Sequence, residues 1–466
     1  MNTKGEEDSP EQHYTDTLTA ACGLADPNAV WGMTQAASEL VRSLHHLGVQ
    51  FNVTDDDELD LRNFGGQKKK RTAFAQSDTG KQLMTALIDA VRREESAGTV
   101  ERFPHHKFRT LLLSGNICGG CTVQDTYTGE LLRFVCDAVL IATGGLHGLF
   151  GDTTGSLANT GEVTAELFRL GVPMANLEMI QYHPTTVELG EKRMLLSEAA
   201  RGEGGRLFAL RNGKPWYFME EKYPELGNLM PRDITAREVW TVSRDYEVFL
   251  DMTELAKEVM EHKLAGLVDD CQTYLHKDIR KEPIPILPGI HYFMGGIQVD
   301  ERHRTSMRNL YAAGECCAQY HGANRLGGNS LLGAIYGGQI AAETACRETV
   351  SSPNMPCAEE SLLPELSPDA QMQMNRILLN ALGVVRDAQT LEAGIQEIRK
   401  LSGTLPLLGC AMLESALARK ESRGAHWRAD YPQRNDAVYC KTTVAHWNGQ
   451  HIAISFESIP ERRHDL

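Results

Sequence analysis

Five short segments of the chain combine charged or imidazole side chains with glycine or proline. Arginine guanidinium groups bind carboxylates through two parallel hydrogen bonds, and neutral histidines and a serine hydroxyl can donate further hydrogen bonds to carboxylate oxygens. Such a set would suit a small dicarboxylate. The segments are His183-Pro184-Thr185, Ser197 to Gly205 (SEAARGEGG), Pro231-Arg232-Asp233, His291 to Gly296 (HYFMGG) and His321 to Ser330 (HGANRLGGNS).

Each of these segments has a purely structural interpretation when it is taken alone. A lone histidine is more often structural, an Arg232-Asp233 pair is usually a solvated or structural charge, and paired glycines can be turns. The spacing predicts no Ser-His-Asp site and no HExxH metal site. Cys118 and Cys121 have CxxC spacing without a second pair, which favours strand or turn cysteines over a metal or redox site. The functional prediction therefore depends on the joint pattern.

The charge and hydropathy of the chain exclude several classes of protein. The formal net charge of −15 argues against a broad nucleic-acid interface, although local arginines can still bind an anionic substrate. Lys68 to Arg71 (KKKR) is interpreted as a solvated loop. We find no run of about 18 apolar residues, which predicts that no helix spans a membrane. The polar N-terminus lacks the apolar core of a signal peptide, so a cytoplasmic location is the default expectation.

The elements that must position these residues follow from periodicity. Apolar residues at helical spacing predict a helix over residues 28–48, which Gly48 would end, and a second helix over 79–93. Ala138 to Ala142 and Leu310 to Ala313 are short apolar runs ending in glycine, typical of buried parallel strands whose ends bind a ligand.

The rest of the chain divides by composition. Residues 176–290 lack the strand–glycine–helix rhythm and are interpreted as an inserted domain. Residues 327–346 predict a helix whose N-terminus faces a phosphate or a flavin carbonyl. After a polar linker at 351–368, residues 369–421 show three helical periods, and residues 425–466 predict irregular structure with a strand pair.

The joint pattern resembles the flavoprotein subunit of succinate dehydrogenase and fumarate reductase, from Lys4 to about Pro460. The strings that carry the resemblance are NFGGQ (63–67), IATGG (141–145), NTGE (159–162), QYHPT (181–185), SEAARGEGG, PRD, EPIP (282–285), HYFMGG, AAGE (312–315), HGANRLGGNSLL (321–332) and RGAHWRADYPQRND (423–436).

The resemblance implies a role for each matching residue of the substrate site. Arg232 matches the arginine that protonates fumarate. Glu198 and Arg201 match a proton relay to that arginine. The residues that match those holding the two carboxylates of the substrate are His183, Ser197, His291 and Arg325; Ser197 stands where the family usually has threonine and keeps the hydroxyl.

The resemblance also implies FAD as cofactor. Glu315 matches the acid that binds the ribityl chain, and Asn329 and Ser330 match residues near the flavin ring. Gly144 and Gly145 are expected at the strand end that faces the cofactor. Glu162 replaces the usual aspartate, and its flavin contact is an expectation.

The resemblance predicts an α/β fold. We expect a Rossmann-like FAD-binding domain that lacks its first βαβ unit, an inserted α+β capping domain and a C-terminal helical domain. The expected bounds are 1–175 and 292–355 for the FAD-binding domain, 176–291 for the capping domain, 356–425 for the helical domain and 426–466 for a C-terminal segment.

Two other functions remain open. L-aspartate oxidase is a sister flavoenzyme with a similar site, but its usual string is ANRLASNS, whereas this chain has ANRLGGNS. A non-catalytic homologue that assists complex assembly is the second. The family implies an iron–sulfur subunit and membrane anchor subunits as partners. These would place the chain peripherally on the cytoplasmic face of the inner membrane.

The sequence departs from the family at its start, because no GxGxxG motif of a βαβ unit of about 30 residues precedes Lys4. A truncated gene model, a separate polypeptide that supplies the unit, and a degenerate homologue are three explanations, of which we favour the first. An uncovered parallel sheet would be unfavourable. We therefore expect the chain expressed alone to be unstable or poor in flavin, which bound-flavin absorbance measures. A full flavin complement would contradict this expectation.

Overall fold

The computed structural model describes residues 8–62, 64, 67, 69–76, 78–190, 192–348 and 365–463. Three residues of the NFGGQ string, Lys68 of the basic run and most of the 351–368 linker lie outside these ranges. In the described part, no helix has the length and apolar character needed to cross a membrane.

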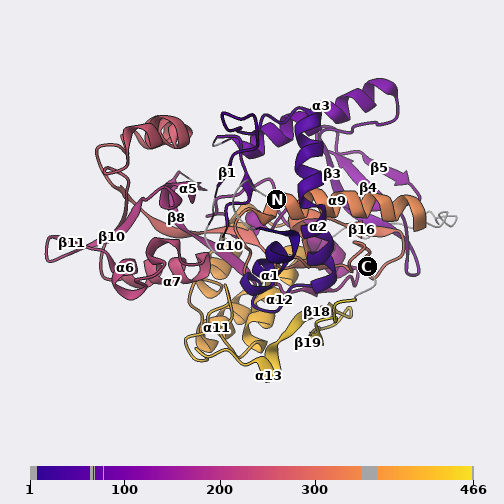
Figure 1. Ribbon diagram of the computed structural model, residues 1–466. Coiled ribbons are helices and arrows are strands. Elements are labelled where there is room, and N and C mark those ends of the chain that lie inside the picture. The colour runs from indigo at the N-terminus through magenta and orange to yellow at the C-terminus, as the bar shows by residue number, and fades with distance from the viewer. Residues whose placement is uncertain are drawn as a thin grey trace.

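Three helices form the N-terminal part of the chain: α1 (Pro10–Ala20), α2 (Pro27–Leu47) and α3 (Thr79–Ala97) (Figure 1). The carboxylate of Asp26 caps α2 by accepting hydrogen bonds from two backbone N–H groups of its first turn. Gly48 ends α2 with φ of 117°, a conformation that glycine adopts without steric penalty. Both predicted helices are confirmed, and α3 extends past its predicted end. The short strands β1 (Leu61–Arg62) and β2 (Thr72–Ala73) pair between α2 and α3.

The two predicted parallel strands are β6 (Val139–Ile141) and β16 (Leu310–Ala312), and they pair in parallel with each other. Their ends place Gly144, Gly145 and Glu315 at one edge. The expectation that both strands are buried was wrong for β6, because Leu140 is 41% exposed. In the described part of the chain this sheet has only two strands, so β6 has no second neighbour to cover it.

Two further sheets surround this pair. Strands β3 (His106–Ser114), β4 (Ile117–Asp125) and β5 (Leu131–Val135) form an antiparallel meander. A five-stranded sheet has the order β17-β15-β7-β18-β19, from Cys317–Ala318, Gly296–Gln298, Met174–Ala175, Lys441–Trp447 and Ile452–Ser458. The C-terminal strand pair was predicted, but its pairing with β7, through Val444 and Ala175, was not.

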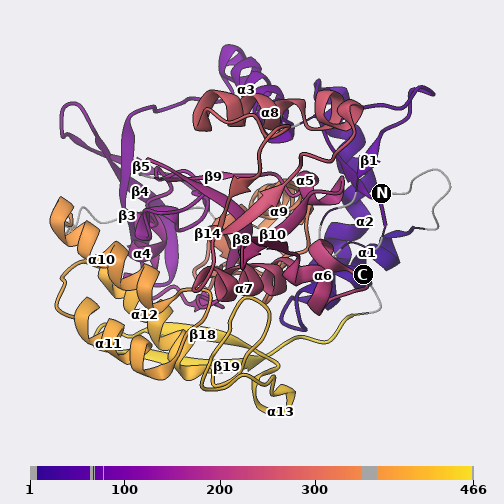
Figure 2. The same ribbon diagram turned by 90° about the vertical axis from the view of Figure 1, so that its left-hand side faces the viewer.

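The inserted unit has its own hydrophobic core, around Leu196, Leu207, Val239 and Leu250. Its first sheet has the order β14-β8-β9, from Leu287–Phe293, Ile180–Leu189 and Lys192–Leu195. Its second has the order β11-β10-β12-β13, from Lys214–Trp216, Arg206–Arg211, Val248–Asp251 and Ile284–Pro285. Its α-helices are α5 (Ala199–Gly202), α6 (Phe218–Lys222), α7 (Arg232–Ser243) and α8 (Ala265–Asp270). Figure 2 shows its strands β8 and β10 beside helix α7.

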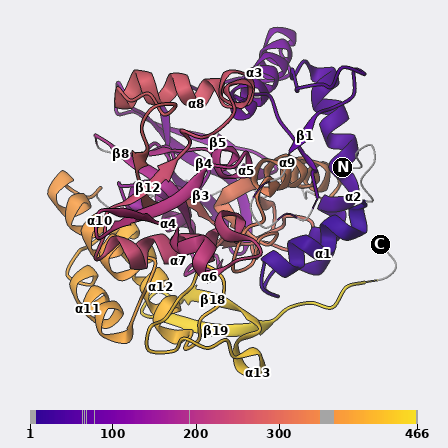
Figure 3. The same ribbon diagram turned by 60° about the vertical axis from the view of Figure 1, so that its left-hand side comes forward.

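The predicted C-terminal helices are confirmed as α10 (Pro368–Ala381), α11 (Ala388–Ile398) and α12 (Thr404–Ala418). They share the main core with α4 (Glu162–Arg169). Figure 3 shows α11, α12 and the β18–β19 hairpin together at the lower edge of the molecule. Helix α9 (Asn329–Glu348) packs on α2, and the short α13 (Asp436–Tyr439) precedes β18. The predicted α/β architecture with an inserted unit and a C-terminal helical unit is confirmed.

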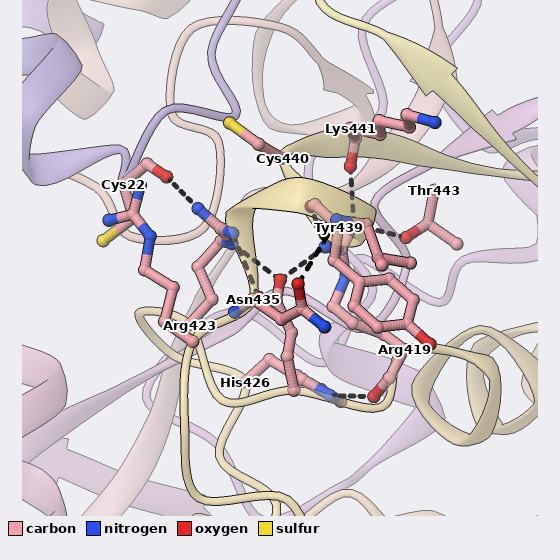
Figure 4. Close-up of polar contacts among 12 residues, drawn as sticks. Cys22, Arg419, Arg423, His426, Asn435, Tyr439, Cys440, Lys441 and Thr443 are labelled. Atoms are coloured by element: carbon pink, nitrogen blue, oxygen red, sulfur yellow. Dashed lines mark hydrogen bonds and ion pairs between the residues drawn. The ribbon is translucent and has the colours of Figure 1, made fainter.

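A buried network of ion pairs joins the C-terminal segment to the rest of the molecule (Figure 4). Arg419 contacts Glu178 at 2.7 Å and Glu421 at 2.9 Å, and Arg423 contacts Glu421 at 2.7 Å. None of these four side chains is exposed. Arg423 also donates a hydrogen bond of 2.7 Å to the carbonyl oxygen of Cys22. The network therefore connects the turn before β8, the C-terminal segment and the turn between α1 and α2.

We predict that Glu421→Gln lowers the free energy of unfolding by about 3 kcal/mol, because it leaves two buried arginines without a shared carboxylate. Glu397→Gln is the matched control, since its pair with Lys400 is largely exposed and exposed pairs contribute about 0–1 kcal/mol. Urea denaturation of both variants measures the difference. Equal midpoints for the two variants would show that the network does not stabilise the fold.

Candidate active site

Arg232 is the first residue of α7, and it is 6% exposed. Its Nε and Nη2 donate hydrogen bonds to Oε2 of Glu198 at 3.0 and 2.6 Å. Its Nη1 donates to Oε1 of Gln181 at 3.0 Å. The guanidinium group is thus held on two sides by side chains from other segments.

Glu198 links Arg232 to Arg201. Nη2 of Arg201 donates to Oε1 of Glu198 at 2.8 Å, and its Nη1 donates to the carbonyl oxygen of Asn228 at 2.6 Å. Burial alone would raise the pKa of Glu198, but Arg232 and Arg201 outweigh burial and lower it below its usual range. Burial lowers the pKa of Arg201. The three predicted catalytic residues therefore form one continuous chain of charges, Arg201–Glu198–Arg232.

His183 and His291 lie on the neighbouring antiparallel strands β8 and β14. Their ring centroids are 5.3 Å apart, and the ring planes are inclined at 65° to each other. Burial, followed by the charge of Arg232, holds the pKa of both histidines well below 6.5. Both rings are therefore neutral near pH 7. Nδ1 of His291 lies 2.9 Å from Oγ1 of Thr154.

Arg325 lies on the segment between β17 and α9, with its guanidinium carbon 4.4 Å from the centre of the Tyr292 ring. In the described part of the chain its buried Nε has no hydrogen-bond partner. Burial and the nearby Arg232 lower the pKa of Arg325 to about 9. This side chain is a buried cation with an unused donor, which an anionic ligand would stabilise.

An open cavity of about 1060 Å³ brings several predicted residues together. Its lining does not include His183 and Ser197, although His183 packs against His291. The half-buried Ser197 accepts a hydrogen bond of 3.3 Å from the backbone N–H of Ala199. The predicted residues that line the cavity are Arg232, His291, Arg325, Asn329 and Ser330.

The predicted cofactor residues differ in their surroundings. Oε1 of Glu315 accepts a hydrogen bond of 3.0 Å from the backbone N–H of Phe293. A Cβ atom at Gly145 would lie 2.6 Å from that same oxygen, and one at Gly144 would lie 2.6 Å from the amide of Asn159. Gly144 also has φ of 72°, which favours glycine, whereas a side chain at Gly145 would require the Glu315 carboxylate to shift.

Asn329 and Glu162 have partners that the sequence did not indicate. The amide of Asn329 contacts Nε2 of His13 at 2.9 Å and Oγ1 of Thr17 at 3.0 Å, so it fastens the start of α9 to α1. Glu162 pairs with Lys107 at 2.9 Å and lines a different cavity. The structure therefore does not bring Glu162 to the cavity of Arg232, and its flavin contact stays a prediction.

Two polar residues of the site were not predicted. The amide of Gln181 accepts from Arg232 and donates to Oδ1 of Asn324 at 2.9 Å and to the carbonyl oxygen of Arg325 at 3.0 Å. Gln181 precedes His183 by two residues on β8, and this alternation was the available signal. Thr154, the second, carried no signal, because its partner His291 is distant in sequence.

FAD, the cofactor that the resemblance implies, can be tested against the chemistry of this cavity. One wall is apolar and includes Leu40 and Leu44. Arg62, Arg71 and Arg325 also line it, and each has a buried guanidinium N–H without a partner among the described residues. Buried donors require acceptors. A flavin ring has apolar faces and an edge of carbonyl and nitrogen acceptors, so the residues present fit it.

Comparison with known protein families also indicates an FAD-binding protein. Residues 1–331 match the family described as FAD binding domain, and residues 402–463 match the family described as fumarate reductase flavoprotein C-term. The succinate dehydrogenase flavoprotein subunit of Bacillus subtilis (strain 168) is 37% identical, covering 98% of this chain and 87% of that protein. An L-aspartate oxidase of Streptomyces coelicolor is 30% identical, with coverage of 98% and 85%.

Solved structures share the fold. E. coli quinol fumarate reductase FrdA superimposes with a TM-score of 0.88 at 26% identity, covering 98% of this chain and 88% of that chain. The relatives and the matched families together confirm the family that the sequence motifs indicated. The chain belongs to the succinate dehydrogenase and fumarate reductase flavoprotein family, and it is an oxidoreductase with FAD as its cofactor.

Proposed function

We propose that this protein interconverts fumarate and succinate, with Arg232 as the proton donor and acceptor. The observation that supports the proposal most directly is the buried Arg201–Glu198–Arg232 chain, which ends at a cavity also lined by His291 and Arg325. A single carboxylate balances Arg201 and Arg232, and Arg325 has an unused donor. A dianionic substrate would supply the missing negative charge.

The dicarboxylate is held by donors of two kinds. Arg325 contributes a cation whose planar N–H groups match a carboxylate, and His291 contributes a neutral imidazole. His183 and Ser197 are proposed to bind the second carboxylate, because both belong to the inserted unit and His183 packs against His291. Holding both ends orients the substrate, which can lower the barrier by several kcal/mol.

FAD supplies the hydride donor or acceptor when it is bound. The chain itself must move the proton, and Arg232 is placed to do so. An arginine is a weak acid, with an ordinary pKa above about 12. Glu198 contacts Arg232 and Arg201 with different oxygens, so a proton lost by Arg232 can be replaced along the Arg201–Glu198 pair. The lowered pKa of Glu198 keeps this carboxylate ionised, so it retains the ion pairs that join Arg232 to Arg201.

Oxidation of L-aspartate is the alternative activity, because L-aspartate oxidases are among the relatives at 30% identity or more. Gly327 and Gly328 stand where that enzyme usually has Ala-Ser, which favours the fumarate–succinate reaction. The proposed partners are an iron–sulfur subunit and membrane anchor subunits. Through them the chain would lie peripherally on the cytoplasmic face of the inner membrane. A quinol fumarate reductase among the solved relatives supports this proposal.

We predict that Arg232→Gln lowers kcat for fumarate reduction by about 10²–10⁴-fold, the usual contribution of a general acid, while bound FAD is unchanged. Reduced viologen as electron donor measures the rate. Arg244→Gln is the matched control, because this exposed arginine follows α7 and lies outside the cavity. Oxidation of L-aspartate without fumarate turnover would overturn the proposed function.

The pH dependence follows from the lowered pKa values of His183 and His291. A lowered pKa means that the neutral form persists as the pH falls through 6.5, and the cation accumulates only in more acidic solution. We therefore expect kcat/KM for fumarate to show no inflection near pH 6.5. An inflection there that is absent in His291→Gln would contradict the neutral assignment.

A further inference from the structure

The loop Gly151–Thr154 lies directly beside His291. The backbone N–H of Thr154 donates to the carbonyl oxygen of Ile290 at 2.9 Å, and Thr153 forms a parallel bridge with the same residue. The carbonyl oxygen of Thr153 also accepts a hydrogen bond of 3.0 Å from the backbone N–H of Arg193. These backbone bonds hold the loop against β14 and β9, so the position of the Thr154 side chain is set by the fold.

The hydroxyl of Thr154 has two neighbours that can accept its single proton. Nδ1 of His291 is 2.9 Å away, and the carbonyl oxygen of Ile290 is 3.3 Å away. That carbonyl already accepts the backbone N–H of Thr154 at 2.9 Å. The shorter distance favours donation to Nδ1.

His291 can then present only one kind of group to the cavity. Its ring is half-buried and neutral, so it carries one N–H. Nε2 has no hydrogen-bond partner within the residues described, and His291 lines the cavity together with Arg232 and Arg325. If Nδ1 accepts the proton of Thr154, the ring N–H must be on Nε2.

We propose that Thr154 is a positioning residue that fixes His291 as the tautomer with its proton on Nε2, facing the substrate. This tautomer offers a hydrogen-bond donor to a carboxylate. The other tautomer would turn a lone pair toward the carboxylate and repel it. The tautomer follows from the local geometry, whereas its role in binding a dicarboxylate rests on the proposed function.

Two substitutions of Thr154 separate the effect of its hydroxyl group from the effect of its side-chain shape. Thr154→Val keeps nearly the same volume but removes the proton, so Nδ1 loses its donor. Thr154→Ser keeps the hydroxyl and should restore the bond. Thr128→Val is the matched control, because Thr128 lies in the exposed turn between β4 and β5.

The tautomer can be measured without catalysis. In protein labelled with ¹⁵N-histidine, the ring nitrogens of a neutral imidazole give separate signals for the protonated and the unprotonated atom. Comparison with His291→Gln identifies the signals of His291. We expect Nε2 to carry the proton in the wild type, in Thr154→Ser and in Thr128→Val. In Thr154→Val we expect the proton to move to Nδ1, at least in part. An unchanged spectrum in Thr154→Val would overturn the proposal.

Kinetics give the second readout, with fumarate as substrate and reduced viologen as donor. Loss of a hydrogen bond to a charged group should raise KM for fumarate at least about tenfold in Thr154→Val. The kcat value and the FAD content should change much less. Thr154→Ser and Thr128→Val should match the wild type. A spectrum that changes as expected in an enzyme that does not reduce fumarate would reject the proposed function alone. An unchanged KM in an active Thr154→Val enzyme would reject the role of Thr154 in substrate binding.

Discussion

The site depends on the burial of several cations with too few carboxylates among them. Glu198 alone faces both Arg232 and Arg201, and Arg325 has a buried N–H without a partner in the described part of the chain. An unpaired charge in a protein interior is unfavourable, and a bound anion can remove that cost. Burial, followed by the charge of Arg232, lowers the pKa of His291, so the imidazole beside these arginines stays neutral. The cluster as a whole, and not one residue alone, would therefore stabilise a bound anion.

Regular strands hold the groups that need accurate placement. Gln181 and His183 are on β8, and His291 is on its neighbour β14, so backbone hydrogen bonds set the spacing between the two imidazoles. Sites built on strands are placed more accurately than sites on loops, so the two imidazoles keep their relative positions. Gln181 adds a cross-link, since its amide contacts Arg232 and the segment that carries Arg325. The two arginines are thereby fixed relative to each other.

The segment that carries Arg325 is hydrogen-bonded on one side to the N-terminal helical part of the chain and on the other side to the C-terminal segment. The N–H of Ala323 donates to the carbonyl oxygen of Ala21 at 3.0 Å, and its carbonyl oxygen accepts from the N–H of Ala425 at 2.9 Å. A Cβ atom at Gly322 would lie 2.6 Å from the carbonyl oxygen of Ala21, and one at Gly424 would lie 2.5 Å from that of Ala323, so these contacts require glycine. The buried Arg419–Glu178 network lies close to this junction in the sequence and stabilises the C-terminal segment that makes it.

The sequence by itself determined the features that depend on neighbours along the chain. Apolar periodicity located α2 and the three C-terminal helices, and local motifs identified Arg232, His291 and Arg325. Hydrogen-bond partners distant in sequence were decided only by the tertiary structure. Examples are the pairing of Glu162 with Lys107 and of Thr154 with His291. The physical reason is the distance in sequence over which each feature acts. A helix period or a motif depends only on neighbouring residues. A hydrogen bond of about 3 Å between distant residues forms only after the whole chain has placed both atoms.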